Sequence, residues 1–334
     1  MSRKHYYPLR FQPIVKPTVW GARRLGRLLG KSLPEKGPVG ESWEVADHPH
    51  GTSVVANGPL AGKSFHDLIQ ADAFGIAGPD GVTEKGRFVL LFKFLDADGY
   101  TSVQVHPDDE YAREHTDEGS GKTEAWYIVY AEPGARLVRG TQPGIDQESF
   151  RRAVRDGHVE TTLDFFHVEQ GDVIFIPAGV VHALGRGITL AEIQQNSDTT
   201  YRVFDWNRKG LDGKPRELHT EQALDVIRFQ DIGPGKHPRN LVHPRDPFQE
   251  NLVTCDYFAM DRLVVEKEFE VPTREGRFDI LAALTGQGQV RYENGAEPFR
   301  AGQTLYLPAG LNQAVVQADR QLEFLWIRRP EQVQ

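Results

Sequence analysis

Short apolar runs, separated by turns that contain glycine or proline, recur along the whole chain. Arg87–Asp96 (RFVLLFKFLD) and Glu124–Tyr130 (EAWYIVY) are nearly continuous apolar runs of the length of buried strands. Other runs predict further strands: Tyr7–Lys16, Ser102–His106, Phe165–Val168, Val173–Ile176, Ile188–Gln194, Tyr257–Val271, Asp279–Tyr292, Gln303–Leu307 and Gln321–Ile327. The 33 glycines and 21 prolines suit many short strands joined by turns. The pattern therefore predicts a mainly β protein.

A few segments place apolar residues at helical spacing. Ser64–Phe74 does so behind Ser64, a residue type that often caps the start of a helix. The other predicted helices are short: Arg23–Leu29, Asp109–Glu114, Asp146–Asp156 and Thr220–Phe229.

Glycine and proline also mark breaks between the predicted elements. Asn57-Gly58 predicts the turn of a hairpin within Thr52–Leu60, and Gly286–Gly288 predicts a turn in the C-terminal part. The proline-rich segment Ile232–Gln249 shows almost no periodicity, which favours a connection between two domains.

One strand–turn pattern occurs twice. Gly171–Leu184 reads GDVIFIPAGVVHAL, and Gly302–Gln313 reads GQTLYLPAGLNQ. In both, glycine is followed after five residues by proline, after one more by glycine, and after two more by a final position. That position is His182 in the first copy and Gln313 in the second. Two copies favour two barrels of one architecture, of which only the first has an imidazole for a metal.

The first copy resembles the second motif of the cupin proteins, whose barrels bind a metal through this histidine. The resemblance implies two cupin (jelly-roll) β-barrels with a few short helices. We expect residues 1–235 to form a catalytic, metal-binding barrel, and residues 236–334 to form a second barrel that lacks the metal ligands. Taken alone, His182 could also be a core histidine whose nitrogens are satisfied by hydrogen bonds.

Four polar side chains lie in predicted strands or at their ends. They offer an amide oxygen, two imidazoles and a carboxylate: Gln104, His106, Glu124 and His182. A barrel can bring such residues together at its mouth. Two nitrogen and two oxygen ligands suit Zn²⁺ best, with Mn²⁺ or Fe²⁺ as alternatives, so we expect one Zn²⁺ per chain. Taken singly, Glu124 could instead be a salt-bridge partner and Gln104 a surface amide.

Longer stretches between Trp20 and Arg208 resemble the type I phosphomannose isomerases. They are WGARRL, GESWEVADHPHGTSVVANGPLAG, LLFKFLDA, SVQVHPDDEYA, GKTEAWYI, GDVIFIPAGVVHAL and ITLAEIQQNSDTTYRVFDWNR. The resemblance implies that the same four residues are zinc ligands and that Arg202, in NSDTTYR, is the active-site arginine. The short segment between Glu124 and His182 leaves no room for the helical domain of longer members, so the chain resembles the short bacterial form.

This resemblance implies a reversible isomerisation of mannose 6-phosphate and fructose 6-phosphate through a metal-stabilised cis-enediol. Such chemistry needs positive charge near the developing oxygen anion and a group that moves a proton. Arg202 and Lys122 are candidates both for catalysis and for binding the anionic substrate. Asp198 could open the sugar ring, shuttle a proton or orient a cation. Which residue abstracts the proton stays open.

Lys93 is a third candidate for binding the substrate. It interrupts an apolar run, and a lysine in a buried strand must find a partner or point into a polar cavity. The alternative is an edge-strand lysine whose ammonium group reaches solvent.

Other functions fit part of the pattern. A metal-dependent cupin oxygenase usually has more histidine ligands and an apolar pocket, whereas the candidate site of this chain has a glutamine among the ligands and several cationic residues. A sugar-binding cupin without turnover does not need Lys122, Glu124, His182 and Arg202 together. Isomerisation of another hexose, or of unphosphorylated mannose, is poorly separated by sequence because phosphate contacts can come from loops.

Composition limits the expected partners and cellular location of the protein. The net charge of −8 gives no support for nucleic-acid binding, and no run approaches the 18 apolar residues of a membrane span. The N-terminus MSRKHYYPLRF has no apolar core of a secretory signal, and a single cysteine fits a reducing compartment. We therefore expect a cytoplasmic monomer or homodimer whose partner is a small-molecule sugar phosphate.

Overall fold

The computed structural model describes residues 6–230, 232–272 and 276–330, which form many short strands and a few helices. The strands are β1 (Leu9–Gln12), β2 (Ile14–Lys16), β3 (Glu41–Val45), β4 (Asp47–His48), β5 (Gly51–Thr52), β6 (Val54–Val55), β7 (Leu90–Ala97), β8 (Val103–Val105), β9 (Glu124–Ala131), β10 (Arg136–Thr141), β11 (Leu163–His167), β12 (Val173–Ile176), β13 (His182–Ala183), β14 (Ile188–Gln195), β15 (Tyr201–Phe204), β16 (Asn240–His243), β17 (Phe248–Thr254), β18 (Ala259–Val265), β19 (Glu268–Val271), β20 (Asp279–Tyr292), β21 (Gly295–Arg300), β22 (Thr304–Leu307) and β23 (Ala314–Arg328). The prediction of a mainly β protein is confirmed.

The helices lie close to the predicted ranges. They are α1 (Arg24–Leu29), α2 (Phe65–Ala77), α3 (Asp109–His115), α4 (Gln147–Arg155) and α5 (Thr220–Val226), with a 3₁₀ turn at Val159–Thr162. Ser64 caps α2 as predicted, because its hydroxyl accepts a hydrogen bond from the Asp67 backbone N–H. Among the described residues, none of the helices is both long enough and apolar enough to span a bilayer.

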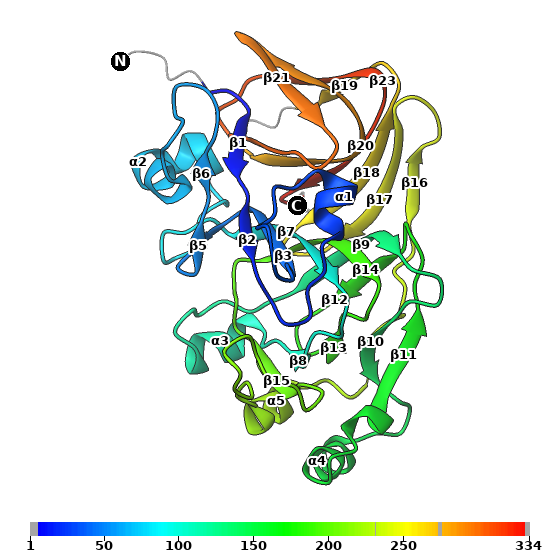
Figure 1. The fold of residues 1–334 in the computed structure, drawn as a ribbon. Helices are drawn as coiled ribbons and strands as arrows, with labels where there is room; N and C mark the ends of the chain where they lie inside the picture. The colour runs from blue at the N-terminus through cyan, green and yellow to red at the C-terminus, as the bar shows by residue number, and fades with distance from the viewer. Residues whose placement is uncertain (1–5, 231, 273–275, 331–334) are drawn as a thin grey trace.

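Two antiparallel sheets of the N-terminal half face each other. One has the strand order β12-β9-β14-β7-β3-β2, and the other has the order β11-β10-β13-β8-β15. Buried side chains of both pack in one cluster, with Trp126 and Leu190 from the first sheet and Leu137 from the second. Figure 1 shows the five-stranded sheet below the six-stranded one. This arrangement agrees with the cupin-like fold that the motif predicts.

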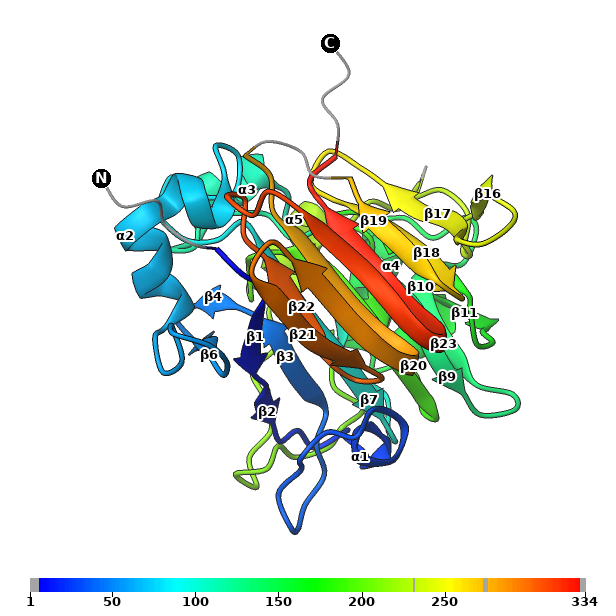
Figure 2. The same cartoon turned by 90° about the horizontal axis from the view of Figure 1, so that it is seen from above.

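A larger sheet combines strands from both ends of the chain. Its order is β16-β17-β18-β23-β20-β22-β1-β6, with β19 paired to β23 and β21 paired to β20. The long strands β20 and β23 run side by side through its middle (Figure 2). β1 enters the sheet by pairing Leu9 with Tyr306 of β22. The domain boundary expected after residue 235 stays a prediction.

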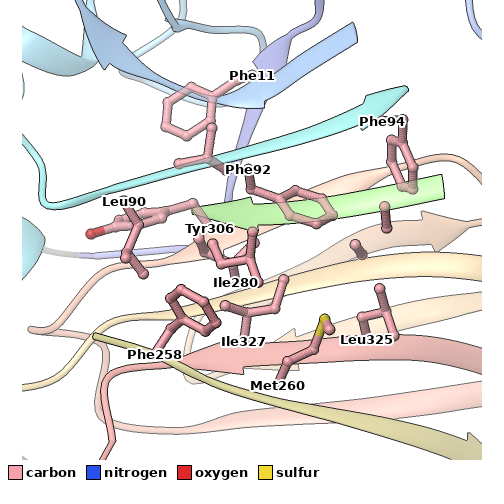
Figure 3. Packing of buried hydrophobic residues seen from close by; sticks show 14 of the residues in the cluster. Phe11, Leu90, Phe92, Phe94, Phe258, Met260, Ile280, Tyr306, Leu325 and Ile327 are labelled. Carbon is pink, nitrogen blue, oxygen red and sulfur yellow. The ribbon is translucent and has the colours of Figure 1, made fainter. Parts of the chain in front are cut away.

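The six-stranded sheet and the ten-stranded sheet share a large apolar core. Figure 3 shows Leu90 and Phe92 of β7 in one layer with Met260 and Ile327 of the larger sheet. Five aromatic rings of this core lie with centroids between 4.6 and 6.0 Å apart: Phe11, Phe65, Phe88, Phe278 and Tyr306. The packed face of the six-stranded sheet leaves only its other face for polar residues.

Strand β7 shows how this burial sorts side chains. Phe92 and Phe94 belong to the core between the sheets, whereas Lys93, between them in the sequence, points to the opposite face. Lys93 is only 4% exposed, and β7 lies between β14 and β3. The alternative of an edge-strand lysine that reaches solvent is therefore wrong.

Several strand predictions need correction. Pro13 interrupts the predicted strand Tyr7–Lys16, so that β1 and β2 belong to different sheets. Tyr257–Val271 consists of β18 and β19, which pair with different parts of β23. No turn forms at Gly286–Gly288, because β20 continues through this segment with a register shift.

Two predictions for loops are also wrong. Asn57-Gly58 does not close a hairpin within Thr52–Leu60; it lies in a longer loop, after which Lys63 and Ser64 return antiparallel beside Val54 and Val55. The Asn57 side chain instead accepts from the Arg10 N–H and donates to the Pro8 carbonyl, which ties the loop to the entry strand. Ile232–Gln249 is only partly a connection, because β16 forms within it and pairs with β17. Local turn signals cannot show such long-range pairing.

The aromatic core predicts a large cost for truncating one of its rings. Phe88 is fully buried and lies 4.6 Å from Phe278 between ring centroids. We expect Phe88→Ala to lower the free energy of unfolding by about 3–5 kcal/mol, because burial is lost and a cavity remains. Urea denaturation measures this change. Phe74→Ala is the matched control, since Phe74 is 67% exposed and should cost less than about 1 kcal/mol. Equal costs for the two variants would contradict the assigned core.

Candidate metal centre and active site

The four predicted ligands lie between the two sheets of the N-terminal half. Gln104 in β8 and His182 in β13 belong to the five-stranded sheet and are paired residues of adjacent strands. Glu124 is the first residue of β9 in the six-stranded sheet, and His106 follows the end of β8. Strands therefore hold three of the four side chains, and a strand end holds the fourth.

Short distances connect the four side chains. One oxygen of Glu124 lies 3.3 Å from His182 Nε2, and the other lies 3.5 Å from His106 Nε2. Gln104 Nε2 lies 3.4 Å from His182 Nε2. A half turn of the Gln104 amide would present its oxygen to the same point. Ligand atoms of the two histidines and Glu124 lie close enough together to hold one metal ion.

Hydrogen bonds orient both imidazoles for this role. His106 Nδ1 lies 2.8 Å from the Thr199 carbonyl, and His182 Nδ1 lies 2.9 Å from the Val180 carbonyl. With Nδ1–H as the donor, the lone pair of each Nε2 faces the other ligands. Burial lowers the pKa of both histidines, and the charge of Lys122 lowers it further. Neutral imidazoles are the form that binds metals.

Unsatisfied polar atoms fit a cation at this point. His106 Nε2 and Glu124 Oε2 are buried and have no hydrogen-bond partner among the described residues. Burial alone would raise the pKa of Glu124, but Lys122, at 2.9 Å, and the two histidines lower it well below its usual range. One buried carboxylate oxygen and one buried acceptor nitrogen without donors suit a bound metal ion.

A cavity of about 150 Å³ lies beside these ligands. Gln104 and Glu124 line it, and so do the other predicted site residues: Lys93, Lys122, Asp198 and Arg202. The Nε of Arg202 is buried without a hydrogen-bond partner, although its Nη1 donates to the Glu217 carbonyl. The structure therefore brings all the predicted site residues to one place.

Sequence reasoning missed a buried carboxylate opposite Lys93. Glu192 in β14 lies 3.0 Å from Lys93 Nζ, and its other oxygen accepts a hydrogen bond from Trp126 Nε1 at 2.8 Å. Burial and the nearby Glu124 carboxylate raise the pKa of Glu192 to about 7. Glu41, 3.5 Å from Lys93, completes the group. The sequence signal that could have identified Glu192 is a charged residue inside the apolar run ITLAEIQQ, the same kind of signal that identified Lys93.

The loop that carries Asp198 is held by a second carboxylate, also missed. Glu118 accepts hydrogen bonds from the Ser197 hydroxyl at 2.6 Å and from the Asp198 backbone N–H at 2.9 Å. It also lies 3.1 Å from His48 Nε2. Burial would raise the pKa of Glu118, but these donors lower it to about 2.

A second group of possible metal ligands lies beside this loop: His48, His50 and Asp198. His48 Nδ1 accepts from the His50 backbone N–H, and its Nε2 faces Glu118. His50 Nδ1 lies 2.8 Å from Asp198. Because both nitrogens of His48 already have partners, the group fits a hydrogen-bond network better than a metal site.

The low pKa of Glu118 predicts how its contribution to stability depends on pH. The unfolded carboxyl, with its ordinary value of 4.5, takes up a proton before the folded one does, so the contribution is lost as pH falls from about 4.5 towards 2. We expect Glu118→Gln to lower the melting temperature at pH 7 by more than at pH 3.5. Scanning calorimetry at both values measures the gap. A gap that is equal at both values would refute this role, and the exposed Glu84→Gln provides the control.

The facing antiparallel sheets and the buried ligand group define a cupin-like β protein with a candidate metal centre. Residues 9–125 match the family model described as phosphomannose isomerase type I, catalytic domain. The chain is 35% identical over 306 residues to mannose-6-phosphate isomerase ManA of Bacillus subtilis, with 92% of this chain and 94% of that protein covered. It therefore belongs to the type I phosphomannose isomerase family, as the sequence resemblance predicted.

Further similarities agree with this membership. A mannose-6-phosphate isomerase of Streptococcus mutans is 34% identical over 90% of this chain and 92% of that protein. The crystal structure of the mannose 6-phosphate isomerase from Bacillus subtilis superposes with a TM-score of 0.86 at 32% identity, covering 95% of this chain and 99% of that one. The likeness thus extends over nearly the whole chain, including the C-terminal sheet.

Proposed function

We propose that the protein interconverts mannose 6-phosphate and fructose 6-phosphate at the cavity between the two N-terminal sheets. The observation that carries this proposal is a buried group of metal ligands beside a cavity lined by Lys93, Lys122 and Arg202. These cationic groups suit a dianionic sugar phosphate, although carboxylates of Glu41, Glu124, Glu192 and Asp198 line the same cavity and the chain as a whole carries a net charge of −8. Family membership supports the same reaction.

The family implies a metal ion, and we propose that it is one Zn²⁺ per chain. The ligands are Gln104, His106, Glu124 and His182. Their nitrogen and oxygen donors, without a thiolate, suit a catalytic rather than a closed structural zinc site. When bound, the ion would supply a Lewis acid that polarises the carbonyl of the sugar.

The protein's own residues bind the anion and move the proton. Arg202, with its unpartnered Nε, and Lys122 stabilise negative charge that develops on the sugar oxygens. Lys93 adds positive charge to the cavity, and Asp198, hydrogen-bonded to His50, assists ring opening or proton transfer. Glu192 joins the candidates for the transferring group, because it lines the cavity and because burial and the Glu124 carboxylate raise its pKa above the ordinary value of a glutamate.

An assay with two sugars and a chelator tests this function. We expect turnover of mannose 6-phosphate, little turnover of mannose, and loss of both in the presence of a chelator, with recovery on addition of Zn²⁺. Equal turnover of the free sugar would favour the alternative isomerase. Sugar binding without turnover would favour the non-catalytic alternative. Cytoplasmic location and a monomeric or homodimeric state stay part of the proposal.

Removal of one ligand should remove the metal and the activity together. In His182→Ala the ion loses one of four ligands, so we expect a fall in zinc affinity of at least about 100-fold. Metal analysis after dialysis and the isomerase assay measure the two effects. His167→Ala is the control, because His167 is exposed at the end of β11. Full activity with bound zinc in His182→Ala would refute the ligand assignment.

Replacement of the arginine should separate catalysis from metal binding. We expect Arg202→Ala to keep its zinc but to lose about 10²–10³-fold in kcat, since one charged donor to the transition state is removed. The exposed Arg186→Ala serves as the control. If only KM rises, Arg202 binds the substrate without stabilising the transition state.

A further inference from the structure

A tyrosine of the C-terminal half contacts an aspartate close to the candidate site. Tyr257 lies between β17 and β18, and its hydroxyl donates a hydrogen bond to Asp109 Oδ2 at 2.6 Å. Asp109 is the first residue of α3, in the N-terminal half, three positions after His106. The short distance is typical of a hydroxyl bonded to an ionised carboxylate.

The other oxygen of Asp109 holds two more segments. Oδ1 accepts from the Gly121 backbone N–H at 2.8 Å and from Gln195 Nε2 at 2.9 Å. The side-chain oxygen of Gln195 in turn accepts from the Thr123 backbone N–H at 2.9 Å. One carboxylate therefore connects the C-terminal sheet, the end of β14 and the segment 121–123.

This segment carries Lys122 and leads into Glu124, two residues on which the proposed chemistry depends. Lys122 stands between the two anchored positions, and Glu124 follows directly. The Lys122 backbone N–H donates to the Pro107 carbonyl, next to His106, at 3.0 Å. At Gly121 the two segments of the chain approach so closely that a Cβ on residue 121 would lie 2.5 Å from the Asp108 carbonyl carbon. The loop is thus fixed against the segment that follows one candidate metal ligand.

We propose that Tyr257 is a positioning residue, which acts through Asp109 to fix the loop that presents Lys122 and Glu124. The inference rests on the proposed function for the roles of these two residues. It gives the C-terminal half an indirect part in the reaction, through Asp109, in addition to its part in the apolar core. Displacement of a reacting group by about 1 Å can cost 10²-fold in rate, so a distant hydrogen bond of this kind is able to affect kcat.

A second tyrosine provides a matched control. Tyr306 of β22 also connects the two halves, because its hydroxyl donates to the Ile76 carbonyl at 2.9 Å. Its ring is fully buried in the core, and its bond leads to the end of α2 rather than to the cavity. Tyr257→Phe and Tyr306→Phe therefore each remove one hydroxyl between the halves, but only the first change affects the Asp109 network.

The experiment compares both variants with the wild type in kcat, KM, zinc affinity and melting temperature. We expect Tyr257→Phe to lose about tenfold in kcat and about tenfold in zinc affinity, measured by competition with a chromophoric chelator. Tyr306→Phe should keep wild-type values of both, although its melting temperature falls by at least as much. In an Asp109→Asn background, Tyr257→Phe should have little further effect on kcat, because both changes break one path.

The outcomes separate this inference from the proposed function. If Tyr257→Phe keeps the kcat and the zinc affinity of the wild type, or changes them no more than Tyr306→Phe does, the positioning role is refuted. If the wild type does not turn over mannose 6-phosphate, the proposed function fails by itself. In that case, weaker zinc binding in Tyr257→Phe alone would still support the positioning role towards Glu124.

Discussion

Charges that are buried between two sheets persist only if they neutralise one another, and the candidate site is built on this requirement. Lys93 lies 3.0 Å from Glu192, and Lys122 lies 2.9 Å from Glu124. The opposite face of β7 is packed against the ten-stranded sheet, so Lys93 has no route to solvent on that side. The pairs therefore hold their side chains in the cavity, and a metal ion would add positive charge beside Glu124 and the neutral histidines.

The four candidate ligands could be singled out in the sequence because each lies beside a local signal, and their role as ligands stays a prediction. His182 follows a turn that contains proline and glycine. Gln104 and His106 are separated by one valine in a predicted strand, so they share one face of it. Glu192 was not identified as a site residue, since its contact with Lys93 depends on the strand register that places the two residues opposite each other. Tyr257 depends on contacts between residues that are far apart in the sequence, and no local pattern marks it. The same limit explains the strand errors: Pro13 separates two sheets, and only the tertiary structure shows which partner each piece takes.

Hydrogen bonds to backbone carbonyls and N–H groups position several residues of the candidate site. The Thr199 carbonyl orients His106, and the adjacent Asp198 lines the cavity, so one short loop serves both the candidate metal centre and the cavity beside it. Glu118, which does not line that cavity, holds the same loop. Asp109 holds the loop of Lys122 in a similar way. Two carboxylates outside the reaction site thus fix the two loops that border it, and each does so by accepting several donors at once.

The pairing of β1 with β22 has a consequence for synthesis on the ribosome. Leu9 is made 297 residues before its partner Tyr306. Until then β1 lacks this neighbour, and the apolar face of β7 has no ten-stranded sheet to cover it. The aromatic cluster around Phe88 can therefore close only after Phe278 and Tyr306 have been made, and until then the nascent N-terminal half exposes apolar surface of the kind that chaperones bind.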